Sequence, residues 1–264
     1  MRKLIDLTRP LVVLKENALP AALKPLERII APTVEFVDHK GGAQIMCGLF
    51  NCPPGDLPEG EGWAEENLSI SSHLGTHVDA PWHYGSTTAG RPAKTVDQIP
   101  LEELFCDGIV LDVTHKRATG EPIEVKDLQQ ALAKIGCKIK PGDAVMMRTD
   151  HDKFGLTELA RYNYPGMTRE STLWLAEQGA KVGGTDALGW DRPFPVMIAD
   201  YQRTKDKSKI WDAHFACRDV EFYVVQQLAN LDKLPAKGFQ VAFFPLLLVG
   251  ASAAPARVVA FVEG

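Results

Sequence analysis

Three of the seven histidines and one aspartate lie within eleven consecutive residues of the chain. In chain order these side chains are His73, His77, Asp79 and His83. Imidazole and carboxylate groups are the ligands that borderline and hard divalent cations prefer in proteins. The cluster therefore predicts a metal site. The alternative is a chance cluster of surface or core histidines, and four candidate ligands around one glycine argue against it.

The spacing of the cluster predicts a local backbone shape. On a strand, His77 and Asp79 would point to the same side, because side chains alternate with a period of two. His73 would then lie about 13 Å from His77, which is too far for two ligands of one ion. On a helix, by contrast, His73 and His77 would share one face. We expect a strand at 77–79 and a bend at Gly75 that returns His73 to the metal.

A loop is expected to present His83, because this residue follows Pro81 and proline ends regular strand pairing. A catalytic metal with three protein ligands keeps an open position for water. His83 would act as a general base that moves the protons of that water. A role as fourth metal ligand is the competing assignment for His83.

The run His73-x-Gly75-Thr76-His77-x-Asp79-x-Pro81-x-His83 resembles the signature of the metal-dependent cyclase family, which includes bacterial kynurenine formamidases and isatin hydrolases. The resemblance extends from Ile5-Asp6-Leu7 to the last predicted strand, so it covers nearly the whole chain. It implies a single α/β domain over residues 1–264, in which a mixed β-sheet or partial barrel is flanked by helices. It also implies a homo-oligomer, either a dimer or a higher form.

His214 and Gln226 match a second feature of that family. In the formamidase branch, a His and a Glu twelve residues apart help to hold a second metal, whereas this chain has Gln at the Glu position. Two divalent ions about 3.5–4 Å apart need anionic ligands to offset their repulsion. We therefore expect one ion, with both side chains in or just outside its shell, and we treat His214 as a catalytic candidate. The alternatives are a His214 without a ligand role and a solvent-facing Gln226.

Three other side chains are candidates for contact with substrate or with the metal ligands. Trp63 ends a loop rich in proline and glycine, residues 51–62, that could cover the site, although a tryptophan of the core is the alternative. Trp82 lies inside the histidine motif. Ser252 belongs to a turn of small residues, 250–255, and the resemblance places that turn near the metal.

Hydrophobic periodicity and turn signals predict the elements that must position these residues. We expect strands at 3–8, 34–37, 43–49, 67–70, 108–113, 144–149, 182–186, 238–245 and 257–262. The second and third of these would form a hairpin around Gly41 and Gly42. We expect helices at 23–30, 123–135 and 168–178, and a helical stretch from roughly 213 or 220 to 228.

Composition indicates a globular protein and argues against several kinds of partner and location. A chain of 264 residues with 45% hydrophobic and 24% charged residues is typical of a soluble globular protein with one core. A net charge of −5 without a basic stripe argues against a nucleic-acid partner. The five scattered cysteines contain no CxxC pair, which favours reduced thiols and a cytoplasmic location. The most apolar tract, residues 241–254, is too short to span a membrane, and the first residues lack the apolar region of a secretory signal.

The predicted metal site and the resemblance to the cyclase family imply a hydrolase that acts on a small-molecule substrate. The resemblance to the isatin hydrolase branch implies the opening of a cyclic aryl amide, of the isatin-to-isatinate type, by attack of metal-bound hydroxide. A bound metal lowers the pKa of water from about 15.7 toward about 7. That branch implies Mn²⁺, while the ligand types leave Zn²⁺ open. The alternatives are an arylformamidase that acts on N-formylkynurenine and a metal-binding protein without catalytic activity.

Overall fold

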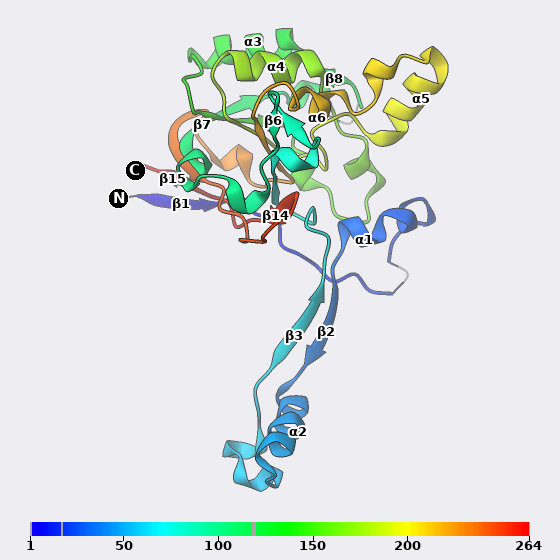
Figure 1. Cartoon of the computed structure of the whole chain (residues 1–264), viewed down its shortest axis with the longest axis vertical. Coiled ribbons are helices and arrows are strands. Elements are labelled where there is room, and N and C mark those ends of the chain that lie inside the picture. Colours follow the sequence, from blue (N-terminus) through cyan, green and yellow to red (C-terminus); the bar gives the residue numbers. More distant parts are fainter. Residues whose placement is uncertain (1, 17, 118–119, 264) are drawn as a thin grey trace. The chain divides into compact units, whose positions relative to one another are not determined.

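A nine-stranded mixed β-sheet lies at the centre of the larger of two compact units (Figure 1). The computed structural model describes residues 2–16, 18–117 and 120–263. The larger unit comprises Met1–Pro10 and Ser72–Gly264, and the smaller unit comprises Leu11–Ser71. The expected mixed sheet flanked by helices is confirmed, and a single domain over residues 1–264 stays a prediction.

The strand order of the sheet is β1-β15-β13-β7-β9-β11-β12-β4-β14. The strands in this order are Lys3–Asp6, Val259–Val262, Lys237–Ala242, Phe105–Asp112, Ala144–Arg148, Val182–Thr185, Tyr223–Gln226, His77–Asp79 and Ala253–Pro255. The four central strands, β7, β9, β11 and β12, run parallel to one another, and the pairs on either side are antiparallel. Short two-residue strands are β5 (Thr87–Thr88), β6 (Arg91–Pro92), β8 (Pro122–Ile123) and β10 (Gly166–Met167).

Apolar side chains cover both faces of the central strands. In β9, Val145 and Met147 pack in one hydrophobic cluster and Ala144 and Met146 in another, as the period of two requires. Helices α3 (Val125–Ile135) and α4 (Arg169–Glu177) contribute to the first cluster. A sheet that is covered on both faces reads in the sequence as continuous apolar runs, which is why these strands could be predicted.

The ends of α3 and α4 follow the expected signals. Gly136 ends α3 with φ +57°, a conformation that favours glycine, and Thr168 caps the first turn of α4 by accepting from the N–H of Ser171. The remaining α-helices among the described residues of the larger unit are α5 (Phe194–Thr204) and the short α6 (Asp212–Ala216). No helix among the described residues is both long enough and apolar enough to cross a membrane.

The prediction of a helix reaching residue 228 was wrong. The helix α6 ends at Ala216, and residues Tyr223–Gln226 form the strand β12, which pairs with β11 and β4. A short apolar run fits a buried strand or a buried helix equally well by periodicity. Gln226 therefore projects from a strand and not from a helix.

The smaller unit contains the helices α1 (Glu27–Ile30) and α2 (His39–Phe50) and an antiparallel pair of strands, β2 (Thr33–Val37) with β3 (Glu65–Ser69). The predicted strand at 43–49 and its hairpin at Gly41 and Gly42 were wrong, because these residues belong to α2. The carboxylate of Asp38 caps this helix by accepting from Gly41 N–H over 2.9 Å. Gly42 is required for close packing, since a Cβ there would lie 1.7 Å from the carbonyl oxygen of Trp63.

Candidate metal centre

The strand β4 places two of the predicted ligands on the same side of the sheet. His77 and Asp79 are 2% and 0% exposed, and Val78 between them packs into the opposite hydrophobic cluster. In the register of the sheet, Gln226 of β12 lies directly opposite His77. These three side chains therefore share one face, as neighbouring positions on paired strands do.

The expected bend at Gly75 is confirmed, and it returns His73 to β4. Gly75 has φ +64°, in the left-handed region that favours glycine. His73 Nδ1 lies 2.8 Å from Asp79 Oδ1, and its Nε2 lies 3.1 Å from Ser252 Oγ. Ser252 precedes β14, the strand that pairs with β4, and it contacts His73 directly. A direct contact of Ser252 with substrate stays a prediction.

One atom at the centre of the cluster lacks a hydrogen-bond partner. Asp79 Oδ1 is buried and accepts no hydrogen bond from any residue that the structure describes, although His73 Nδ1 is 2.8 Å away and His77 Nε2 is 3.3 Å away. A buried carboxylate oxygen that two imidazole nitrogens approach this closely is the arrangement expected of side chains that bind a common cation. The donor set and its geometry therefore fit a divalent metal ion.

The tautomer of His77 supports the same interpretation. Nδ1 of His77 lies 2.7 Å from the carbonyl oxygen of Gly75, and a carbonyl can only accept a hydrogen bond. Nδ1 therefore carries the hydrogen, and Nε2 faces Asp79. A metal-ligating histidine usually donates its other ring N–H to a backbone carbonyl in this way.

His83 lies at ligand distance as well. The short turn Pro81–His83 presents it, and one ligand atom from each of His73, Asp79 and His83 lies within 4.8 Å of the others. Burial and the neighbouring imidazoles lower the pKa of His83 to about 3, against the opposing effect of Asp79. A neutral His83 could either bind a metal or accept a proton. The ligand set of His73, His77 and Asp79 and the catalytic role of His83 both stay proposals.

His214 is held by an aspartate that sequence reasoning missed. Asp191 accepts the backbone N–H of Ala213 over 2.7 Å, the N–H of His214 over 3.1 Å, and the Nδ1 hydrogen of His214. His214 Nε2 consequently faces Asp79 Oδ2 at 3.6 Å. Burial opposes the charge on this imidazole, but Asp191 and Asp79 raise the pKa of His214 to about 9. No motif spacing marks the pair of Asp191 and His214.

The amide of Gln226 has a defined orientation. Its Oε1 accepts the backbone N–H of Trp190 over 3.1 Å, and its Nε2 donates to Asp79 Oδ2 over 2.5 Å. Because an amide NH₂ group cannot ligate a cation, Gln226 contributes a hydrogen-bond donor here and no metal ligand. Burial opposes ionisation of Asp79, but the facing imidazoles of His77 and His214 hold its pKa well below the usual range.

Trp211 was also missed, and it forms an aromatic wall beside the imidazoles. Its ring stacks on His214 with centroids 4.4 Å apart and meets the His83 ring at right angles with centroids 5.0 Å apart. Trp211 has φ +50° and ψ +43°, a left-handed conformation that bulky residues rarely adopt. Trp82 is 47% exposed, and Trp63 belongs to the smaller unit, so their contact with substrate stays a prediction.

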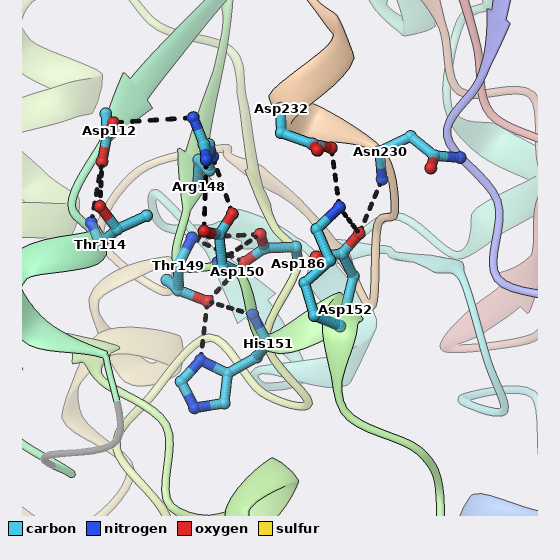
Figure 2. A network of polar contacts seen from close by, with 11 residues as sticks. Asp112, Thr114, Arg148, Thr149, Asp150, His151, Asp152, Asp186, Asn230 and Asp232 are labelled. Carbon is cyan, nitrogen blue, oxygen red and sulfur yellow. Dashed lines mark hydrogen bonds and ion pairs between the residues drawn. The ribbon is translucent and has the colours of Figure 1, made fainter.

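A second acidic group lies at the ends of β9 and β11, where Asp150, Asp152 and Asp186 come within 4.8 Å of one another (Figure 2). Asp186 accepts the backbone N–H groups of Thr149 and Asp150, both over 2.9 Å. Arg148 pairs with Asp150 at 2.8 Å, and Lys153 pairs with Asp152 at 3.2 Å. Every carboxylate in this group already has a hydrogen-bond or ion-pair partner, so the group links the ends of β9 and β11.

The Cyclase family model, described as "Putative cyclase", matches residues 5–192. An isatin hydrolase of Roseibium aggregatum is 29% identical over 212 residues, which are 74% of this chain and 73% of the relative. A kynurenine formamidase of Erythrobacter litoralis is 28% identical over 192 residues, 73% of this chain and 74% of the relative.

Solved structures with the same fold were also found. Isatin hydrolase A from Labrenzia aggregata, bound to benzyl benzoate, superposes with a TM-score of 0.72 at 26% identity, covering 100% of this chain and 94% of that one. Isatin hydrolase A from Ralstonia solanacearum gives a TM-score of 0.73 at 26% identity, covering 99% and 92%.

Proposed function

The chain belongs to the cyclase family, and from this premise we propose that it is a metal-dependent hydrolase that opens a cyclic aryl amide of the isatin-to-isatinate type. One observation carries the metal dependence. Asp79 Oδ1 is buried without a hydrogen-bond donor among the described residues, and two imidazole nitrogens face it at 2.8 and 3.3 Å. His73, His77 and Asp79 would hold one divalent ion. Mn²⁺ is the ion we favour, with Zn²⁺ as the alternative.

A divalent ion in this position would supply a Lewis acid that polarises the amide carbonyl and acidifies water. The protein side chains supply the remaining steps. In this proposal a ring nitrogen of the neutral His83 imidazole accepts a proton from the attacking water. The same imidazole would then deliver that proton to the amide nitrogen as the C–N bond breaks. Asp191 keeps His214 Nε2 directed at the site, where it adds a hydrogen-bond donor near Asp79.

The shape of the surroundings supports an aryl substrate. Trp211 and His83 present ring surfaces at 89° to each other beside the ligand cluster. A planar aromatic substrate gains from stacking and edge contacts with such rings, whereas an aliphatic amide of the same size does not. The isatin hydrolases among the similar proteins support the same substrate class.

The amide of Gln226 is evidence for one bound metal ion rather than two. An amide donates to Asp79 Oδ2 where a carboxylate would be needed to offset the charge of a second cation. This favours the isatin hydrolase branch over the formamidase branch. The arylformamidase alternative rests on the similar kynurenine formamidases, and it would require a second ion beside His214.

We also propose a homo-oligomer in the cytoplasm that binds no nucleic acid and no membrane. The family resemblance supports the oligomer. The five cysteines are free, which suits a reducing compartment. The net charge of −5 does not favour binding to nucleic acid.

Metal analysis combined with a substrate screen tests the proposed function. Purified protein supplied with Mn²⁺ or Zn²⁺ is assayed for turnover of isatin and of N-formylkynurenine, and its metal content is measured. The His83→Ala variant is measured in the same way. We expect isatin to be opened by the wild type, and we expect His83→Ala to keep the metal and lose turnover. Turnover of N-formylkynurenine with two ions per subunit would favour the formamidase. Metal retention without turnover of either compound would favour a protein that only binds metal.

A further inference from the structure

The C-terminal end of α2 brings two of the five cysteines together in the smaller unit (α2 in Figure 1). Asn51 follows the helix in the left-handed conformation, with φ +51° and ψ +48°. The backbone N–H groups of Asn51 and Cys52 both donate to the carbonyl of Cys47, the second over 3.2 Å. This is a Schellman-type end of a helix, in which the side chains at the positions of Cys47 and Cys52 contact each other.

The two thiols lie within reach of one another and of solvent. Cys47 and Cys52 are both partly exposed. Partial burial, contact with the Cys52 thiol and the nearby Asp56 carboxylate raise the pKa of the Cys47 thiol. The hydrogen bond from Cys52 N–H to the Cys47 carbonyl holds the two residues close together, and a disulfide requires Cα atoms about 4.4–6.8 Å apart. Pro53 follows at once and restricts Cys52 to an extended backbone.

We propose that Cys47 and Cys52 form an oxidation site at which a peroxide converts the two thiols into a reversible disulfide. One thiol loses its proton, and the thiolate attacks an oxygen of hydrogen peroxide. The O–O bond breaks, a sulfenic acid forms, and the leaving hydroxide takes up the thiol proton as water. The second thiol loses its proton and attacks the sulfenic sulfur, the S–S bond forms, and the S–O bond breaks, so that the leaving hydroxide takes up this proton as a second water. The two sulfur atoms lose two electrons in total, and the peroxide gains them. A dithiol reductant reverses the reaction.

The disulfide would close a small ring around the end of α2. The ring runs from Cys47 to Cys52 and contains Asn51, so it would hold the left-handed residue on which the helix end depends. The other cysteines offer no comparable partner arrangement at a helix end. Cys106 and Cys217 are buried, and the thiol of the partly exposed Cys137 donates to the carbonyl of Lys138 over 3.5 Å. Oxidation should therefore select the pair on α2.

Thiol counting with peptide mapping tests this proposal on the full-length protein. The folded protein is treated with hydrogen peroxide, denatured, alkylated and digested with trypsin. The tryptic peptide 41–94 contains Cys47 and Cys52 and no other cysteine. We expect two of the five thiols to resist alkylation. We also expect the mass of this peptide to be lower, by two hydrogen atoms, than that of the same peptide with two free thiols. After chymotryptic cleavage at Phe50, the two fragments should stay joined until a reductant is added.

Single substitutions provide the matched controls. Cys47→Ser and Cys52→Ser should each abolish the loss of two thiols, whereas Cys137→Ser, which removes another partly exposed thiol, should leave that loss unchanged. A non-reducing gel separates an internal disulfide from one between chains. Full alkylation of all five thiols after peroxide treatment would overturn the proposal. The same two-thiol loss in Cys47→Ser, or a link only between chains, would overturn it as well.

Discussion

Replacing Gln226 by glutamate reverses the interaction that, in the proposed function, limits the site to one cation. In the wild type, Gln226 Nε2 donates to Asp79 Oδ2 over 2.5 Å. In Gln226→Glu, a second carboxylate faces Asp79 in the same buried space. Two charges about 4 Å apart repel by about 4 kcal/mol at an effective dielectric constant of about 20. That energy corresponds to a rise of about three units in the pKa of the introduced carboxyl group.

The sign of the pH dependence follows from that rise. The pKa of the introduced carboxyl group is raised in the folded state. The loss of folding stability is therefore absent below pH 4.3, about the pKa of glutamate in the unfolded chain, and is complete above about pH 7. The metal-free variant should therefore be less stable than the wild type by about 4 kcal/mol at pH 8, and by much less at pH 4.5. A second divalent ion would remove the repulsion, so the variant should bind two ions where the wild type binds one.

Elemental analysis and thermal unfolding with and without Mn²⁺ measure these effects. Gln226→Met provides the control, since it removes the hydrogen-bond donor and adds no charge, and it should bind one ion at most. The reasoning is refuted if Gln226→Glu binds one ion and unfolds at the wild-type temperature at pH 8 without metal. It is also refuted if the wild type already holds two ions.

Three more substitutions test other parts of the site and its support. Asp191→Asn removes the carboxylate that orients His214. It should lower activity or metal affinity about 10- to 100-fold, measured as kcat and as the Kd for Mn²⁺. Unchanged values of both would contradict the positioning role of Asp191. Trp211→Leu should raise KM for isatin about 2- to 12-fold, the worth of one aromatic pair, while an aliphatic amide that is turned over should show no such change. Burial raises the pKa of Asp186 to about 7 against the hydrogen bonds from Thr149. Because the pKa of Asp186 is raised in the folded state, the contribution of this group to the free energy of unfolding is complete below about pH 3.8 and is lost as the pH rises through about 7. Urea unfolding should therefore show that the wild type loses more stability between pH 5 and pH 8 than Asp186→Asn does.

The local geometry of the candidate metal site could be predicted from the sequence. The alternation of His77 and Asp79 predicts a shared strand face, and the glycine at position 75 is the residue that a left-handed bend requires. Both inferences depend only on neighbouring residues and elementary sterics. The strands of the central sheet could be predicted for the same reason, since burial on both faces leaves continuous apolar runs.

Contacts between distant segments could not be predicted in this way. Asp191 precedes His214 by 23 residues, and only the folding of the chain between them brings the two side chains together. The left-handed conformation of Trp211 has no local signal, because tertiary contacts impose it. The errors at α2 and β12 have a related cause. Glycines suggested a turn at Gly41 and Gly42, but the Asp38 cap and close packing at Gly42 select a helix.

Anomalous diffraction at the manganese edge, from crystals grown with Mn²⁺, tests the central claim most directly. We predict one peak per subunit, about 2.0–2.2 Å from Asp79 Oδ1 and from the imidazole nitrogens of His73 and His77. No peak at these three side chains, or two peaks flanking Asp79, would contradict a single cation held by two imidazoles and one carboxylate.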